Sequence, residues 1–108
     1  MLDENSFRKN ADHSLESLKQ SLIVAEGSAD IEVEDQAGAL HISFDDGSRF
    51  VISPNAPVRQ IWISALTTSF KLGWSDAAGT FALDKSGETL NQVMSRILSQ
   101  QLGQKIIV

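Results

Sequence analysis

The side chains best suited to chemistry in this chain are carboxylates in its N-terminal half. Asp12 and Glu16 are four residues apart, so a helix would place both on one face, and His13 lies three residues before Glu16. Glu26 follows near the expected end of that helix. Oxygen-rich ligands in a loose arrangement suit hard or borderline divalent cations, and the spacing outlines no compact cage that would select one cation.

A second group of acids alternates with apolar residues in the next segment. Asp30, Glu32 and Glu34 are separated by Ile31 and Val33, so a strand would present the three carboxylates on one face. If that strand lies at a sheet edge beside the helix, all the acids merge into one ridge. The simpler interpretation is two solvated surfaces, because surface carboxylates usually have no dedicated ligand.

The chain lacks the motifs of common catalytic and nucleotide-binding sites. It contains no glycine-rich phosphate loop, no nucleophile elbow and no His-Glu-x-x-His motif. Only His13 and His41 could act as a base near neutral pH. His41 lies between Leu40 and Ile42 in a strand-like run, so it is expected on the solvent side as an ordinary surface residue. We therefore expect no ordinary catalysis by this chain alone.

Composition narrows the class of protein further. The 108 residues include 42% hydrophobic residues and no cysteine, which fits one folded domain over residues 1–108. The lack of cysteine excludes disulfides, thiolate metal sites and iron–sulfur ligation by this chain. Apolar runs are only a few residues long and residues 1–16 are too acidic for a signal peptide, so we expect a soluble protein with no membrane segment.

Charge is divided unevenly along the chain. Residues 1–46 hold 11 acids and three bases, a net charge of −8, whereas residues 47–108 hold three acids and six bases, a net charge of +3. The acidic half is not expected to bind nucleic acid, since that binding depends on Lys and Arg at phosphates. It should instead attract cations or a basic partner surface.

Hydrophobic periodicity predicts a helix, a run of strands and a second helix. Apolar residues at steps of three and four predict a first helix capped by Asp3 and closed by Gly27, and a second helix from Ser86, its N-cap, to Gly103. Alternating apolar residues predict about six strands in a meander, at Ile31/Val33, Leu40/Ile42/Phe44, Phe50/Ile52, Gln60–Ser64, Ser69–Trp74 and Thr80–Asp84.

Two connections and one architecture follow from this pattern. Asp45–Ser48 predicts a hairpin turn, and the two prolines predict a loop over Ser53–Arg59. The short tail Gln104–Val108 could lie back on the core. The order favours an α+β fold, a two-layer α/β sandwich in which both helices cover one face of an antiparallel sheet and leave the other face to solvent.

Trp62 is the strongest candidate for a protein contact. If Ile61 and Ile63 are buried, Trp62 stands on the open sheet face beside Gln60 and Ser64, and an exposed Trp is a typical interface anchor. In the opposite register Trp62 belongs to the core, and periodicity alone does not decide between the two.

Several of these segments resemble the frataxin family, in order and spacing, over roughly residues 2–103. The central signature resembles Phe50–Ser64, with its proline loop followed by Gln60, Ile61 and Trp62. Further matches are found at Leu2–Glu4 with Phe7, Ala11, Asp12 and Leu15, at Gly38–Leu40, and at Ser86–Leu90.

This resemblance implies a frataxin-like sandwich that binds ferrous or ferric iron (Fe²⁺/Fe³⁺) weakly on an acidic ridge, with other divalent cations as further candidates. It also implies contact with a cysteine desulfurase and an iron–sulfur scaffold protein, as an iron donor or as a regulator of sulfur transfer. The chain is similar to the bacterial, cytoplasmic members, and a monomer with iron-dependent oligomers is expected. Ferroxidase activity has precedent in the family, but spacing places no bridging carboxylate site here.

The resemblance also assigns site residues. It places the iron ridge at Asp3, Glu4, Asp12, His13, Glu16, Glu26, Asp30, Glu32 and Glu34, and the partner contacts at Asn55, Gln60 and Trp62. The chain departs from the family pattern at Gln20, Ile23 and Val24, where relatives commonly carry acids, and at Phe81, where many carry a second Trp. The ridge should therefore hold fewer ions or bind them more weakly.

Two functions of different classes remain. The first is an iron-binding, non-enzymatic accessory protein of iron–sulfur cluster assembly. The second is a small interaction module of the same fold, whose acids bind a basic partner surface and no metal.

Overall fold

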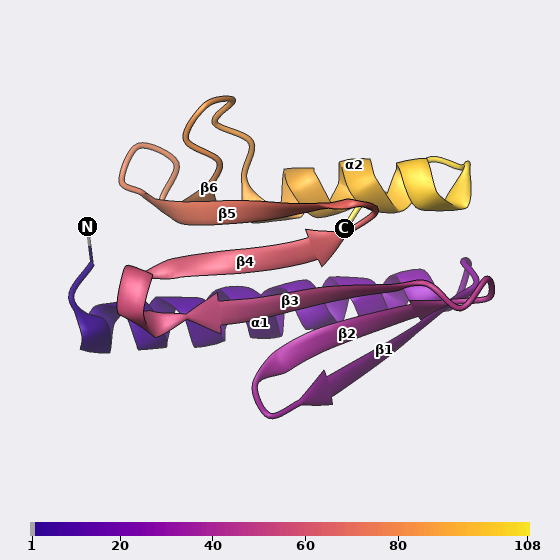
Figure 1. The fold of residues 1–108 in the computed structure, drawn as a ribbon, viewed down its shortest axis with the longest axis horizontal. Helices are drawn as coiled ribbons and strands as arrows, with labels where there is room; N and C mark the ends of the chain where they lie inside the picture. Colours follow the sequence, from indigo (N-terminus) through magenta and orange to yellow (C-terminus); the bar gives the residue numbers. More distant parts are fainter. Residues whose placement is uncertain (1) are drawn as a thin grey trace.

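The segments in which apolar and polar residues alternate form a sheet, as the sequence predicted. The computed structural model describes residues 2–108 and contains one six-stranded antiparallel sheet in the order β1-β2-β3-β4-β5-β6 (Figure 1). The strands are β1 (Ile31–Gln36), β2 (Ala39–Phe44), β3 (Arg49–Asn55), β4 (Gln60–Ala65), β5 (Thr68–Ser75) and β6 (Thr80–Ala82). A short 3-10 helix, η1 (Ala56–Val58), joins β3 to β4.

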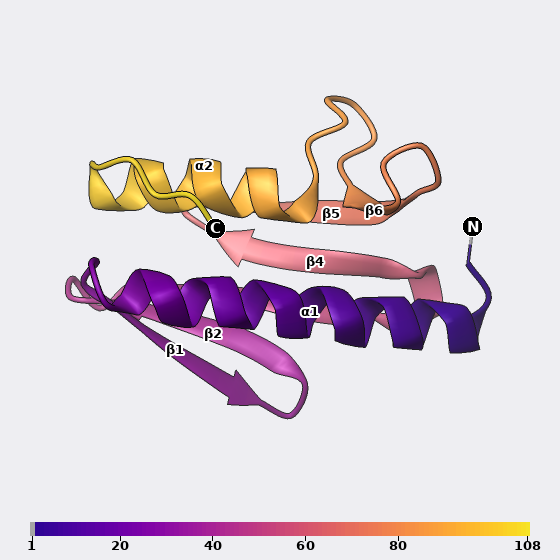
Figure 2. The same cartoon turned by 180° about the vertical axis from the view of Figure 1, so that it is seen from behind.

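Both helices lie on the same face of this sheet, as expected. Figure 2 shows α1 (Glu4–Glu26) and α2 (Leu90–Leu102) in front of the sheet, with β4 visible between them. In the described part of the chain, no α-helix covers the opposite face, which Figure 1 shows. The predicted two-layer architecture is confirmed. In residues 2–108, no helix has the length and apolar character needed to span a membrane.

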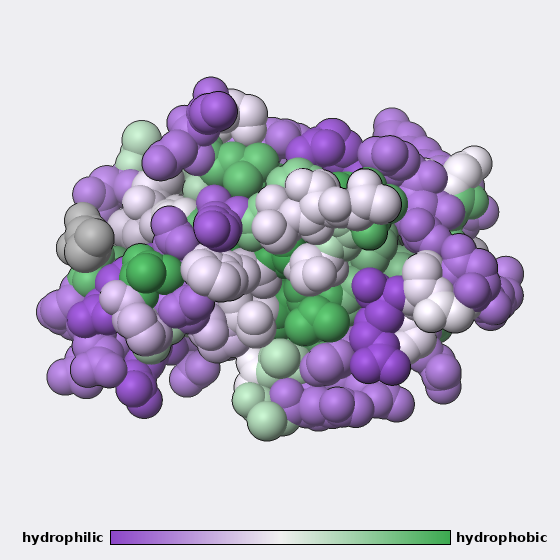
Figure 3. All heavy atoms as spheres, viewed as in Figure 1, coloured by the Kyte–Doolittle hydropathy of each residue, from purple (hydrophilic) through white to green (hydrophobic). Residues whose placement is uncertain are grey.

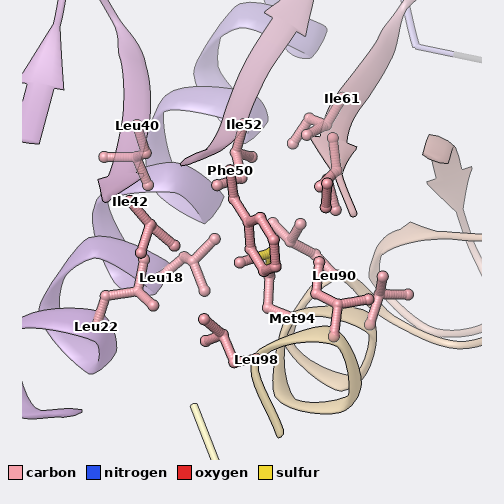
Figure 4. Close-up of a cluster of buried hydrophobic side chains, with 14 of the residues drawn as sticks. Leu18, Leu22, Leu40, Ile42, Phe50, Ile52, Ile61, Leu90, Met94 and Leu98 are labelled. Carbon is pink, nitrogen blue, oxygen red and sulfur yellow. The ribbon is translucent and has the colours of Figure 1, made fainter. Parts of the chain in front are cut away.

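The core fills the space between the two layers (Figure 4). Leu18 and Leu22 from α1 meet Leu40, Ile42 and Ile52 from the sheet, and α2 contributes Leu90, Met94 and Leu98. Each of these side chains is at most 2% exposed. Such burial is the main favourable contribution to folding, about 25 cal/mol per Å² of apolar surface.

The first helix has the predicted limits and the predicted buried stripe. Phe7, Ala11, Leu15, Leu18 and Leu22 are all buried. The N-cap carboxylate, Oδ1 of Asp3, accepts a hydrogen bond of 2.7 Å from the Ser6 backbone N–H, and Gly27 follows the last turn. One stripe therefore fixes which residues of α1 face the solvent.

The second helix begins three residues later than predicted. Ser86 is not its N-cap: the Thr89 side chain accepts from Gln92 N–H, and the Gln92 side chain bonds to the Thr89 backbone N–H, which completes a capping box. Gly87 has a φ of +75°, which is incompatible with helix at that position. Glu88 therefore precedes the helix, whereas Gly103 ends it as expected.

Two strand limits also differ from the prediction. β3 continues through Pro54 to Asn55, where a loop was expected. Proline is tolerated there because β2 pairs with β3 only as far as Ile52, so no β2 residue needs a hydrogen bond from position 54. On its other side Pro54 lies opposite Ile61 of β4. β6 ends at Ala82 and not at Asp84, since the Leu83 N–H bonds to the Glu88 carbonyl.

The C-terminal tail packs back on the molecule as the sequence suggested. Ile106 is 7% exposed, and the Ser99 hydroxyl accepts a 2.9 Å hydrogen bond from its N–H. The Val108 N–H donates to the Ser95 hydroxyl at 2.9 Å. The tail is thereby tied to one face of α2 (Figure 2).

The capping box leads to a stability prediction. Thr89→Ala should lower the free energy of unfolding by about 1 kcal/mol, because it leaves the Gln92 N–H without its acceptor. Ser86→Ala is the matched control and should cost less, since Ser86 lies outside the helix. Urea unfolding of both variants measures the difference, and a larger loss for Ser86→Ala would contradict the assignment of Thr89 as the N-cap.

Candidate functional site

The acids of α1 and β1 gather at one edge of the sheet, as the ridge hypothesis requires. β1 is the edge strand, and α1 packs beside it. Asp12, Glu16 and Asp35 line one open hollow of about 280 Å³. Asp35 also approaches Lys19, with 3.6 Å between its Oδ2 and the Lys19 Nζ, so part of its charge is compensated.

A second acidic hollow lies at the other end of β1. It has a volume of about 350 Å³, and its lining includes the carboxylates of Glu26, Asp30, Glu32 and Asp45. Glu26 Oε2 accepts a 2.9 Å hydrogen bond from the Val33 backbone N–H. One oxygen of Glu26 is therefore committed to the outer edge of β1.

Two acids of this region, Asp35 and Asp45, were not in the predicted ridge. Asp35 directly follows Glu34 in β1, and successive side chains of a strand point to opposite faces. Asp35 therefore faces α1 and not the open side of the sheet. Asp45 belongs to the β2–β3 turn, which was identified only as a hairpin signal. The turn prediction implied that β2 ends there, and the pairing of Ile31 with Phe44 brings Asp45 next to the start of β1.

Two of the three predicted strand acids, Glu32 and Glu34, point as predicted, whereas Asp30 precedes β1, which begins at Ile31. Ile31 is 7% exposed on the helix side, while Glu32 and Glu34 are exposed on the open side. Glu34 lies directly opposite His41 of β2, which shares the open face. His41 is half-buried, and its Nδ1 has no hydrogen-bond partner in the part of the chain that the structure describes.

The remaining predicted ridge residues lie apart from these hollows or have local partners. His13 lines a separate hollow with Asn10 and Trp74, so it does not join Asp12 and Glu16. Asp3 caps α1, and Glu4 forms an ion pair of 3.0 Å with Arg8. The structure thus divides the nine predicted residues among several places.

These carboxylates do not converge on one point. Over residues 2–108, no three His, Asp or Glu side chains are arranged to hold a metal ion between them. The chemistry available to such a surface is electrostatic attraction of a hydrated cation by exposed oxygens. The departures from the family pattern reduce the number of carboxylates further. Ile23 is 43% exposed and Val24 is 79% exposed, so α1 ends with an apolar surface.

The structure decides which side chains of β4 lie on the open face of the sheet. Ile61 and Ile63 are both fully buried, so Trp62 stands on the open face, half-buried among its neighbours. Its Nε1–H donates to Gln60 Oε1 at 2.8 Å, and Lys71 Nζ lies 4.8 Å from the ring centroid. These contacts hold the indole in place, which lowers the entropy that a partner would have to remove.

The predicted partner residues lie together on this face. Asn55 is directly opposite Gln60, and Ser53 is opposite Trp62. Figure 3 shows white and green atoms over the centre of the open face and purple atoms around both ends. Phe81 is fully buried in edge-to-face contact with Phe7 and Trp74, so it adds nothing to this surface.

Comparison with known proteins identifies the family. The family model described as a frataxin-like domain matches residues 1–104. The chain belongs to the frataxin family. Among its curated relatives, a protein from Pseudomonas fluorescens strain Pf0-1 named iron-sulfur cluster assembly protein CyaY is 31% identical over 94% of this chain and 91% of its own length. A protein of the same name from Azotobacter vinelandii is 28% identical over 85% of this chain and 86% of its own.

A solved structure supports the fold. The frataxin from Psychromonas ingrahamii superimposes with a TM-score of 0.82 and covers 98% of this chain and 97% of its own, at 18% sequence identity. At that identity the likeness concerns the frataxin fold alone. The fold inferred from the alternating and helical patterns is therefore confirmed.

The role of Asp3 as a helix cap predicts a pH dependence. The Ser6 backbone N–H, followed by the Ser6 hydroxyl, holds the pKa of Asp3 below its ordinary value of 3.8. A lowered folded-state pKa means that this carboxylate stabilises the fold above pH 3.8 and that its contribution is lost as the pH falls through the lower value. A ¹³C NMR titration of the Asp3 carboxyl should show a midpoint below 3.8.

The matched variant is Asp3→Asn, which keeps a capping oxygen but cannot titrate. In this variant the chemical shift of the Ser6 amide should no longer change at the acidic pH where Asp3 is protonated in the wild type. A midpoint for Asp3 at or above its ordinary value would show that the carboxylate is not held by Ser6.

Proposed function

We propose that this protein is an iron-binding accessory protein of iron–sulfur cluster assembly. The observation that carries the proposal is its membership of the frataxin family over residues 1–104, with relatives that bear the name of that process. The chain has no cysteine, so it cannot hold a cluster through thiolates. It would act on the proteins that build the cluster, in the cytoplasm of a bacterium.

Iron would be cargo on the acidic edge. The two hollows beside β1 bring carboxylates from α1, β1 and the β2–β3 turn to one side of the molecule. Exposed, separated oxygens favour a hydrated ion bound weakly, which suits a protein that must release the metal again. Within these hollows the ligands that we propose are Asp12, Glu16, Glu26, Asp30 and Glu32, extended by Asp35 and Asp45. Asp3, Glu4, His13 and Glu34 lie outside the hollows, and we propose them as separate contacts for a hydrated ion.

The open sheet face would dock the partner. Trp62 is a large side chain held by Gln60 and Lys71, and aromatic residues of this kind contribute disproportionately to binding. The partners that we propose are a cysteine desulfurase and the scaffold protein of cluster assembly, with Asn55 and Gln60 at the edge of the contact. The protein would donate iron to this complex or regulate its sulfur transfer.

Anaerobic titration with Fe²⁺ tests the metal site. Backbone amide resonances of residues 12–34, together with those of Asp35 and Asp45, should shift or broaden because a paramagnetic ion lies nearby. Resonances of the first turns of α2, Leu90–Met94, serve as the internal control, because this end of the helix lies beside β6 and away from the acidic edge. The effect should weaken as the pH falls toward about 4, where carboxylates become protonated.

Glu32→Gln combined with Asp45→Asn removes two carboxylates from one hollow and leaves the other intact. Broadening around Glu26 and Asp30 should then decrease, while broadening around Asp12 and Glu16 persists. Unchanged resonances throughout residues 12–34 in the wild-type protein would rule out iron on this edge.

A reconstituted cluster-assembly assay tests the docking face. Trp62→Ala should raise the protein concentration that gives half of the maximal effect by about tenfold or more, the loss of affinity typical of an interface anchor. Trp74→Phe is the matched control, because Trp74 packs against Phe81 on the helix side. Equal losses in the two variants would argue against a partner on the open face.

The alternative is an interaction module whose acids bind a basic partner without metal. The observation in its favour is that the acids do not converge on one ion, although residues 1–46 carry a net charge of −8. The triple variant Asp30→Lys, Glu32→Lys and Glu34→Lys separates the two functions. Loss of partner binding with no effect of iron on the wild-type protein would support this alternative over the iron role.

A further inference from the structure

Most of β5 is paired with a neighbouring strand on one side only. β4 pairs with it from Thr68 to Gly73, but β6 pairs only with Gly73, Trp74 and Ser75. Figure 1 shows the short β6 beside one end of β5. Within residues 2–108, the outer edge of β5 from Thr68 to Leu72 therefore has no strand beside it.

The register shows which backbone groups point outward. The turn Leu66–Thr67 has two residues, so its flanking pair, Ala65 and Thr68, is a hydrogen-bonded pair. Antiparallel pairs alternate between hydrogen-bonded and non-bonded. The N–H and C=O groups of Ser69 and Lys71 consequently point away from β4, in line with those of Gly73, which lies opposite Ala82 of β6.

These outward groups are available. In residues 2–108, no backbone hydrogen bond from a loop, turn or cap reaches Ser69 or Lys71, and both residues are exposed. The opposite edge of the sheet differs, because Glu26 Oε2 accepts the outward N–H of Val33 on β1. A side chain therefore occupies one outward N–H at the β1 edge, whereas within the described residues Ser69 and Lys71 have no such partner, although open edges normally carry a risk of aggregation.

A groove runs beside the open edge. It has a volume of about 610 Å³, with Ser69, Phe70 and Lys71 on one wall and the β6–α2 connection, including Leu83 and Lys85, on the other. Phe70 and Leu83 are half-buried, so the groove has an apolar part on the helix side of the sheet. Side chains of an added strand would alternate between this part and the open face.

The charges of the groove favour an acidic occupant. The carboxylate of Glu88 is already paired with Arg96, at 2.9 Å and 3.1 Å. Within the described residues, no ion pair involves Lys71 or Lys85, and Asp84 is the one carboxylate in the lining besides Glu88. Lys71 lies on the open face over Trp62, where an acidic side chain of an added strand would meet it.

We propose that the outer edge of β5 binds an extended peptide segment of a partner protein, which adds a strand to the sheet beside Ser69 and Lys71. The segment alternates apolar residues, which cover Phe70 and Leu83, with acidic residues, which meet Lys71 and Lys85. Main-chain hydrogen bonds supply affinity in this type of recognition, and the alternating side chains supply selectivity. The site is separate from the acidic edge and does not require iron.

The test uses a capped heptapeptide of alternating valine and glutamate and the full-length protein. Ser69→Pro removes an outward N–H without breaking a bond to β4, and proline is tolerated on a strand edge. It should weaken peptide binding by about three- to tenfold, the equivalent of one lost hydrogen bond. Ser69→Ala keeps the N–H and should bind the peptide as the wild type does.

Modified peptides separate strand addition from simple charge attraction. N-methylation of every second peptide nitrogen removes the donors along one edge of the extended peptide. Methylation of one alternate set should abolish binding, and methylation of the other set should not. A peptide with lysine in place of glutamate should bind more weakly than the original. Loss of binding with both methylated sets, or with neither, would overturn the proposal.

Hydrogen exchange tests the proposal even if Ser69→Pro fails to fold. In the free protein the amides of Ser69 and Lys71 should exchange much faster than those of Phe70 and Leu72. The heptapeptide should slow the exchange of Ser69 and Lys71 selectively. If sedimentation instead shows a dimer that protects these amides without peptide, a second copy occupies the edge and the peptide proposal is wrong.

Discussion

The packing of the inner sheet face against the two helices is the constraint on which the rest of this structure depends. Ile42, Ile52, Ile61 and Ile63 are each fully buried on that face. Because strand side chains alternate, a shift of one residue in any of these strands would expose an isoleucine to solvent and bury a polar neighbour. The face that carries Trp62, His41 and the strand acids is therefore determined by residues that are themselves buried.

Much of the fold could be predicted from the sequence because it rests on this same alternation and on helical spacing. The buried stripe of α1 followed from steps of three and four, and its cap followed from Asp3. The start of α2 did not, since Ser86 and Thr89 are both acceptable caps. The left-handed backbone at Gly87 decides between them, and a single sequence does not show that conformation.

The candidate site was less predictable than the fold because it depends on contacts between distant segments. Periodicity left the side of Trp62 open, and only the burial of Ile61 and Ile63 against the helices decided it. His13 directly follows Asp12, yet successive residues of a helix are rotated by about 100° from each other, and His13 lines the hollow that contains Trp74. Asp45 joins Asp30 and Glu32 only because the first hairpin brings the ends of β1 and β2 together.

The sheet order also converts the uneven distribution of charge along the chain into a direction in space. The segments up to residue 46, with a net charge of −8, form α1, β1 and β2 on one side of the molecule, and the later segments, with a net charge of +3, reach β5, β6 and α2 on the other (Figure 1). The protein therefore has a permanent electric dipole roughly across its strands. In the field of a charged partner this dipole would turn the molecule before contact, so that the acidic edge arrives first at a basic surface.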